Sequence, residues 1–141
     1  MTAEYILALD YGEKRVGVAI AHTIARMPRP LTTLDNGHTL LDDVRKLVDQ
    51  ERAGIVLVGL PRGMDGGYTA QTRAAEAFAK RLQAELSVPV QLSDETLTSV
   101  DAESRLAGRK HTKADIDALA ATVILERYLT EQSIGEARAD V

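Results

Sequence analysis

The hydrophobic positions near the start of the chain follow the patterns of strands. Residues 5–9 are almost wholly apolar, and residues 16–21 alternate branched apolar residues with small ones. Short runs of these two kinds predict a buried strand and a second strand beside it. Because the intervening "YGEK" around Gly12 is typical of a tight turn, the two strands can pair as an antiparallel hairpin. A short strand at 31–34 is expected to extend the hairpin into a meander.

Farther along, apolar residues recur three or four positions apart, which is the spacing of one helix face. This period predicts helices at 39–51, 69–86 and 98–107, and a last helix that begins near Ile116 and ends near Thr130. Uninterrupted apolar runs stand between some of these helices. "GIVLVGLP" from Gly54 predicts a strand that is buried on both faces, and "VPVQL" predicts a further short strand.

Strands and helices alternate in an order that predicts an α/β fold. Three strands come first, followed by helix, strand, helix, strand and two helices. This order is typical of one five-stranded mixed sheet, with three antiparallel strands, then two parallel strands, and helices on its faces. The 141 residues, 45% of them hydrophobic, suffice for a single core. We expect one domain over residues 1–131 and a frayed acidic tail at 132–141, which has little to bury.

The composition excludes several classes of protein. The absence of cysteine excludes disulfides and thiolate metal sites. The first residues lack the basic start and the long apolar run of a signal peptide, and no stretch approaches the roughly 20 apolar residues of a membrane span. We therefore expect a soluble, cytoplasmic protein. One Phe, four Tyr and no Trp leave few aromatic rings for stacking on bases.

The overall charge does not favour a general nucleic-acid binder, because the formal net charge is −4. The local distribution of charge matters more. A basic cluster between the last two predicted helices consists of Arg105, Arg109, Lys110, His111 and Lys113. Lys14, Arg15 and Arg62 stand in predicted loops. These cations can be solvated loop charges, or they can bind the phosphates of a substrate.

Acidic residues follow two of the predicted strands. Asp10 ends the first strand, and Asp94 and Glu95 follow the last one. Because the carboxyl ends of parallel strands meet at one edge of a sheet, these acids are expected to approach each other if the two strands are parallel. Asp117, about 100° around the last helix from Ile116, lies at the edge of the apolar stripe and can face the same crevice. Like charges so close together are costly without a cation, so the pattern predicts a metal site.

The ligand types in this set indicate which metal would bind. Carboxylate oxygens, with no cysteine and with none of the three histidines adjacent, suit Mg²⁺ or Mn²⁺. Two such ions about 4 Å apart would activate a water and stabilise the leaving oxygen of a phosphodiester. The residues thus predict a metal-dependent nuclease.

Each acid also has a purely structural interpretation. Asp10 can begin a turn, Asp94 can cap one, and Glu95 can be solvated. Asp115 is a natural N-cap of the last helix. Asp117 can stabilise the start of that helix through the macrodipole.

Four ordered motifs resemble one known family. They are "LDYGEKRVGVAIAH", "IVLVGLPRGMDG", "LSDETLTSVDAESRL" and "KADIDALAATVILERYL", and they extend over residues 6–129. Together they resemble the YqgF/RuvX family of pre-16S rRNA nucleases and Holliday-junction-resolvase-like proteins. The resemblance implies an RNase H-like fold and a metal-binding acidic set at Asp10, Glu95 and Asp117. Asp117 is preferred to Asp115 because it follows an aliphatic residue and precedes "ALAA", as the family's final acid does.

Two positions depart from the family's pattern. The family has Asp-Glu-Arg where this chain has "DET", so Thr96 replaces a cation that is expected to face phosphate. Arg62 and Gly63 replace an apolar-Asn pair, and Arg62 can restore a charge nearby. The loss of the arginine bears on substrate geometry more than on metal binding. Asp65 in "GMDGG" can approach the site, but an Asx-turn beside Gly66 is favoured.

The resemblance implies an endonuclease that processes the 5′ end of pre-16S rRNA. A Holliday junction resolvase acting on branched DNA, as a symmetric homodimer, is the alternative. An inert ribosome-assembly module is a third interpretation, although three unneutralised carboxylates would hinder phosphate binding. An actin-like ATPase, suggested by "DYGEKRVGVAI", would need a second related domain, for which the chain has no room. With a nucleic-acid substrate, backbone contacts are expected from Lys14, Arg15, Arg62, Arg109, Lys110 and Lys113.

Overall fold

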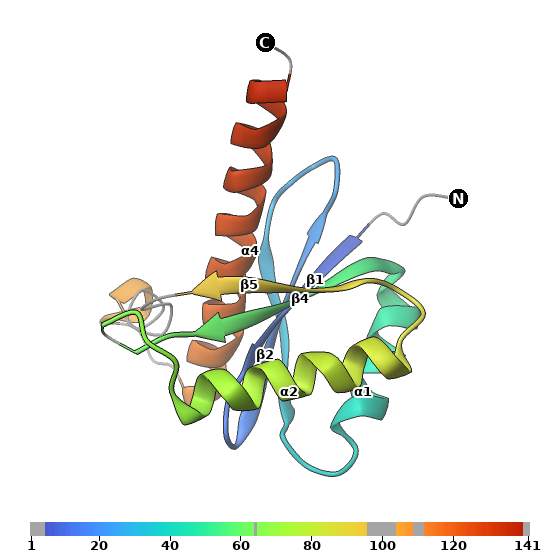
Figure 1. The fold of residues 1–141 in the computed structure, drawn as a ribbon, viewed down its shortest axis with the longest axis vertical. Coiled ribbons are helices and arrows are strands. Elements are labelled where there is room, and N and C mark those ends of the chain that lie inside the picture. The colour runs from blue at the N-terminus through green and yellow to red at the C-terminus, as the bar shows by residue number, and fades with distance from the viewer. Residues whose placement is uncertain (1–4, 64, 96–103, 109–111, 140–141) are drawn as a thin grey trace.

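The computed structural model describes residues 5–63, 65–95, 104–108 and 112–139, with side chains at 5–63, 65–93, 104–108 and 112–131. These residues form a five-stranded sheet in the order β3-β2-β1-β4-β5 (Figure 1). The strands are β1 (Tyr5–Tyr11), β2 (Arg15–His22), β3 (Arg29–Asp35), β4 (Ala53–Pro61) and β5 (Val90–Glu95). β1 pairs antiparallel with β2, and β2 with β3, whereas β1 with β4 and β4 with β5 are parallel. The predicted mixed sheet is confirmed.

A row of paired residues shows how the three parallel strands are aligned. Leu9 of β1 pairs with Val58 of β4, and Val58 pairs with Leu92 of β5. Asp10 follows this row on β1, and β5 continues past it to Glu95. The carboxyl ends of β1, β4 and β5 therefore meet at one edge of the sheet, as the sequence predicted.

Large apolar side chains fill the space between one face of the sheet and two helices. α1 (Leu40–Glu51) and α2 (Ala70–Glu85) cover this face. Phe78 of α2 belongs to the same buried cluster as Leu9 and Val58 from the centre of the sheet. Burial of such side chains, at about 1.5–3 kcal/mol each, makes this face the main source of stability.

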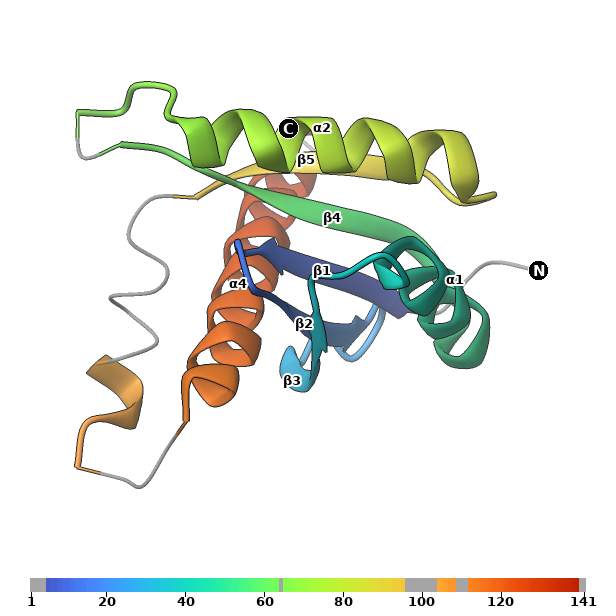
Figure 2. The same ribbon diagram turned by 90° about the horizontal axis from the view of Figure 1, so that it is seen from below.

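Smaller side chains line the opposite face, where α4 (Lys113–Ala139) crosses the strands (Figure 2). Ile124 of α4 shares a buried cluster with Ala8 of β1, Ala19 of β2 and Leu57 of β4. Alanine leaves little side-chain volume between the sheet and the helix, so the backbone of α4 can lie close to the strands.

α4 is longer than the apolar pattern indicates. The predicted end near Thr130 is wrong, because the helix continues to Ala139 and extends beyond the sheet (Figure 1). Alanine, glutamate and arginine are favourable in helices, and a helix that is already nucleated by packing propagates at little cost. The domain boundary at residue 131 stays a prediction. Of the helix predicted at 98–107, residues 104–106 are helical, and residues 98–103 lie outside the described part.

Within the described residues, none of the helices combines the length and the apolar character that crossing a membrane requires.

Candidate active site

The start of α2 fixes the edge where the parallel strands end. Gln71 donates a hydrogen bond from Nε2 to the carbonyl oxygen of Tyr11, at 2.9 Å. Thr72 donates from Oγ1 to the carbonyl oxygen of Pro61. Thr69 and Thr72 also form a reciprocal capping box at this helix start. The last residues of β1 and β4 are therefore held in place relative to each other.

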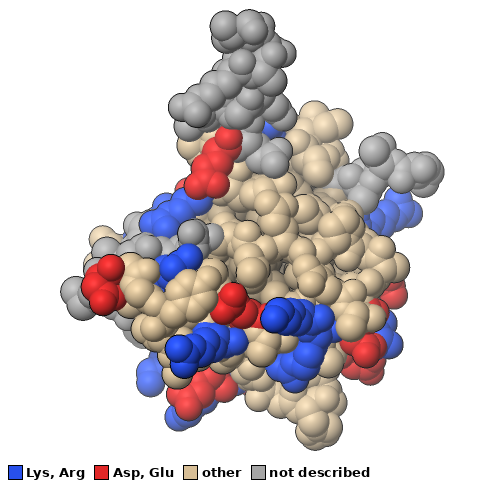
Figure 3. All heavy atoms as spheres, viewed as in Figure 1, with Lys and Arg blue, Asp and Glu red and all other residues tan. Residues whose placement is uncertain are grey.

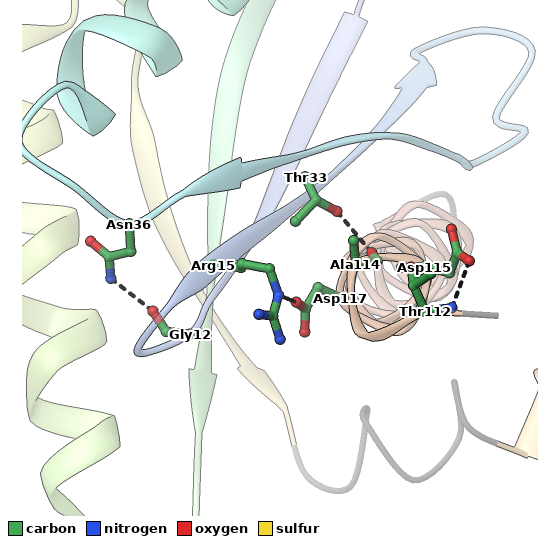
Figure 4. Close-up of polar contacts among 8 residues, drawn as sticks. All are labelled: Gly12, Arg15, Thr33, Asn36, Thr112, Ala114, Asp115 and Asp117. Carbon is green, nitrogen blue, oxygen red and sulfur yellow. Dashed lines mark hydrogen bonds and ion pairs between the residues drawn. The ribbon is translucent and has the colours of Figure 1, made fainter.

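The turn after Asp10 is closed by backbone hydrogen bonds. Gly12 donates from its amide to the carbonyl oxygen of Arg15 at 2.9 Å, and a Cβ at Gly12 would lie 2.5 Å from that same oxygen. Only glycine tolerates so close an approach. Asn36 donates from Nδ2 to the carbonyl oxygen of Gly12 at 2.7 Å (Figure 4). These contacts fix the conformation of the hairpin that carries Asp10 and Arg15.

The first turn of α4 is capped by Thr112. The amide of Asp115 donates to Oγ1 of Thr112 at 3.2 Å, and the amide of Thr112 donates to Oδ2 of Asp115 at 2.9 Å (Figure 4). This reciprocal pair is a capping box in which Thr112 is the N-cap. The interpretation of Asp115 as the N-cap is therefore wrong by three residues. The carboxylate of Asp115 accepts a hydrogen bond within the N-terminal cap of the helix.

The start of α4 packs on a row of paired residues that crosses β3, β2 and β1. Thr33 pairs with Gly17, and Gly17 pairs with Asp10. A Cβ at Gly17 would lie 1.9 Å from the carbonyl oxygen of Asp117, so the helix backbone rests directly on the strand. Thr33 donates from Oγ1 to the carbonyl oxygen of Ala114 at 2.8 Å (Figure 4). The row therefore brings Asp117 to the strand pair that carries Asp10.

Asp117 forms an ion pair with Arg15. Nε of Arg15 lies 2.8 Å from Oδ2 of Asp117, and the two side chains are 30% and 25% exposed (Figure 4). Solvent thus reaches both groups, although each is mostly covered. The sequence prediction missed this pair, because the two residues are 102 positions apart and only the crossing of α4 over β2 brings them together.

The expected acidic set is only partly visible. Asp10 and Asp117 are brought to one place by the contact at Gly17. The backbone of β5 is described to Glu95, but the side chains of Asp94 and Glu95 lie outside the described part. Among the described side chains there is no group of three His, Asp or Glu residues that could hold a metal.

The predicted phosphate-binding cations have different environments. Lys14 and Lys113 are exposed, at the hairpin turn and at the start of α4. Arg62 lies over the ring of Tyr68, with its guanidinium carbon 4.4 Å from the ring centroid. Its Nη1 donates to the carbonyl oxygen of Gly66 at 3.3 Å. The cation–π contact and the hydrogen bond hold Arg62 within the loop that follows β4.

The basic cluster before α4 is only partly described. Arg105 forms an ion pair with Glu126 of α4, with Nη1 2.6 Å from Oε1. The cluster residues Arg109, Lys110 and His111, as well as Thr96, lie outside the described residues. Their predicted contacts with substrate stay predictions.

Asp65 forms the favoured Asx-turn. Its Oδ1 accepts a hydrogen bond from the amide of Gly67 at 2.9 Å, two residues along the chain. Gly63 donates from its amide to the carbonyl oxygen of Gly67 at 2.9 Å, which closes the same loop. The carboxylate of Asp65 therefore shapes the loop after β4, as predicted.

The sequence model of the family described as "RuvX: Holliday junction resolvase" matches residues 4–131. The chain belongs to this family. Among its RuvX-like relatives, a protein of Chloroflexus aurantiacus named "Putative pre-16S rRNA nuclease" is 43% identical over 92% of this chain and 88% of its own length. A protein of the same name from Paraburkholderia phymatum is 37% identical over 92% and 87%.

Solved structures show the same fold. The Thermus thermophilus RuvC structure in complex with a Holliday junction substrate has a TM-score of 0.55 and 15% identity, over 92% of this chain and 96% of that one. A second T. thermophilus RuvC structure has a TM-score of 0.56 and 14% identity, with the same coverage. The RNase H-like fold expected for a RuvX family member is thereby confirmed.

Proposed function

We propose that the protein is a divalent-metal-dependent endonuclease that hydrolyses phosphodiesters of structured nucleic acid. Asp10, Glu95 and Asp117 are its proposed catalytic and metal-binding acids. The observation that carries the proposal is the contact at Gly17, which joins the strand pair of Asp10 to the backbone of Asp117 near the start of α4. Family membership supports nuclease activity independently of this geometry.

The acids have the right chemistry for a hard cation. Asp10 and Asp117 are intermediate in exposure, so both carboxylates are held by the fold and are still in contact with solvent. Carboxylates of this kind bind Mg²⁺ or Mn²⁺. When bound, one or two such ions would activate a water and stabilise the leaving oxygen of the phosphodiester.

The sheet register favours Glu95 over Asp94 as the third acid. Alternate positions of a strand belong to opposite faces of the sheet. Position 94 pairs with Leu60, whose buried cluster is covered by α1 and α2. Position 95 pairs with Pro61, one step farther, and so belongs to the face that α4 and Asp10 share.

The cations of the chain supply contacts to the nucleic-acid backbone in this proposal. Lys14 and Lys113 are exposed at the hairpin turn and at the start of α4, the two segments that carry Asp10 and Asp117. Acidic and basic side chains alternate along the lower side of the molecule, over α1 and α2 (Figure 3). In this proposal the backbone contacts are made at the site and not on that face. The proposed set also includes Arg15, Arg62, Arg109 and Lys110.

The proposed substrate is the 5′ end of pre-16S rRNA. The names of the curated relatives support pre-16S rRNA as the substrate, at 37–43% identity over most of each chain, and the 5′ end is our proposal. Branched DNA is the second candidate, favoured by the description of the family model. A resolvase would act as a homodimer with two sites, because a four-way junction must be cut on two strands.

The decisive experiment measures cleavage of a precursor rRNA fragment and of a four-way junction with Mg²⁺ or Mn²⁺. We expect RNA cleavage by the wild type and its loss in Asp10→Asn and Asp117→Asn, with both variants still folded. Asp115→Asn is the matched control, because asparagine can still accept the hydrogen bond from the Thr112 amide.

The possible results separate the candidates. Cleavage by Asp10→Asn at the wild-type rate would rule out the acidic mechanism. Preference for the junction, together with a dimer in light scattering, would favour the resolvase. Cleavage of neither substrate by the wild type would favour the ribosome-assembly module.

A further inference from the structure

We propose that Arg15 is an internal counterion of Asp117, which a divalent cation has to displace in order to bind. This inference rests on the proposed function, because it assumes that Asp117 is a metal ligand. It assigns Arg15 a role in the metal-free protein that precedes any contact with substrate.

The ion pair lies where the metal is expected. Arg15 belongs to the strand β2 and has the same parity as Gly17, so both positions face α4. Gly17 pairs with Asp10, and the Asp117 backbone rests on Gly17. The guanidinium of Arg15 therefore enters the site of the proposed acids from the strand beside Asp10.

Electrostatics gives the pair a reason to form. Two carboxylates that are brought close together in a partly covered site repel each other, and a nearby positive charge offsets this repulsion. A guanidinium carries a positive charge, so Arg15 supplies a counterion at this position. In the metal-free protein Arg15 thus compensates Asp117 in the way that a bound cation would.

A divalent ion and Arg15 compete for the same carboxylate. Oδ2 of Asp117 already accepts the hydrogen bond from Nε of Arg15 at 2.8 Å. An ion bound by Asp117 would weaken that bond and repel the guanidinium. The Arg15 side chain is 30% exposed, so it can turn toward solvent without opening the core. Once displaced, its fork of N–H donors suits a phosphate.

The competition is measured as Mn²⁺ affinity in the absence of nucleic acid, by calorimetry, for the wild type and Arg15→Gln. We expect Arg15→Gln to bind Mn²⁺ about three- to fivefold more tightly, the order expected for loss of a partly exposed pair. Without Mn²⁺, its melting temperature should be below that of the wild type. Arg15→Lys keeps the charge and should bind Mn²⁺ within about twofold of the wild type.

A matched control removes an ion pair elsewhere. Arg45 of α1 and Glu85 of α2 lie 3.1 Å apart, on the opposite face of the sheet. Arg45→Gln should leave the affinity for Mn²⁺ unchanged. A gain in affinity that appears equally in Arg45→Gln would overturn the inference, because it would reflect the net charge of the protein.

A second measurement uses the wild type alone and does not depend on the folding of a variant. The Arg15 Nε–H resonance should shift, and its exchange with solvent should accelerate, as Mg²⁺ is added. An unchanged resonance at saturating Mg²⁺ would contradict the displacement.

Failure of the inference and failure of the proposed function give different results. If Asp10→Asn and Asp117→Asn abolish Mn²⁺ binding but Arg15→Gln does not strengthen it, only the role of Arg15 is overturned. If both acid variants bind Mn²⁺ as the wild type does, the acidic site itself is wrong and the inference fails with it.

Discussion

The two faces of the sheet differ in the size of their side chains. On β2, Val18 and its neighbours of the same parity are buried beneath α1 and α2, whereas Gly17 and Ala19 face α4. Large side chains keep a helix away from the strands, but at Gly17 the backbone of Asp117 touches the sheet. The face that contributes less apolar volume is therefore the one that holds the candidate site. Residue volume, as well as charge, decides where Asp117 lies.

Phe78→Ala should have the largest effect on stability. Phe78 packs on the face of the sheet that does not hold the candidate site. Phe78 is fully buried, and its ring packs on Tyr11 with 4.6 Å between the centroids. The free energy of unfolding should fall by about 3–5 kcal/mol, because a cavity replaces the ring. Urea denaturation measures this change. Mn²⁺ affinity of the folded fraction should stay at the wild-type level, and a matching loss of affinity would contradict the division of roles between the faces.

Gly17→Ala should have a smaller effect on stability and a larger one on activity. The added Cβ would overlap the Asp117 carbonyl, so α4 has to shift at its first turn. We expect a loss of about 1–3 kcal/mol in the free energy of unfolding. Cleavage should fall about 100-fold, because displacement of a catalytic group by about 1 Å is that costly. Denaturation and a cleavage assay on one preparation measure both effects.

Ala19→Gly provides the comparison for Gly17→Ala. It removes a Cβ from the same strand and face, and it should cost about 1 kcal/mol without moving α4. If Gly17→Ala retained wild-type cleavage, the close contact at Gly17 would not position the site.

Thr112→Ala should have the smallest effect. Loss of the N-cap should lower the free energy of unfolding by about 1 kcal/mol, and fraying of the first turn of α4 should weaken Mn²⁺ binding several-fold. Thr69→Ala removes the equivalent cap from α2 on the other face. It should lower stability by a similar amount but leave Mn²⁺ affinity unchanged. Equal loss of affinity in both variants would show that the caps act only through global stability.

Much of the fold is predictable because its signals are local. The apolar run that ends at Asp10 and the alternation that follows predicted the hairpin, and the turn at Gly12 joins the two strands. The convergence of β1 and β5 at one edge followed from topology rules. The Asx-turn of Asp65 was predictable as well, because its hydrogen bond spans two residues.

The parts that could not be predicted depend on distant contacts or on competition between neighbours. Arg15 and Asp117 meet only because α4 crosses β2, which no local pattern encodes. Both Thr112 and Asp115 are good capping residues. Which of them is the N-cap depends on the residue at which the folded helix begins, and the sequence alone does not give that residue. The length of α4 beyond Thr130 also escaped the apolar pattern, because residues with favourable helix propensity continue there after the apolar period has ended.

The separation between Arg15 and Asp117 has a consequence for synthesis of the chain. The hairpin with Asp10, Arg15 and Gly17 emerges from the ribosome before α4, which begins at Lys113. A chain that stops before Lys113 has the first acid and its neighbouring cation but lacks the helix that carries the last acid. The contact at Gly17 therefore forms only after α4 has been synthesised, so the site is completed later than the hairpin that carries its first acid.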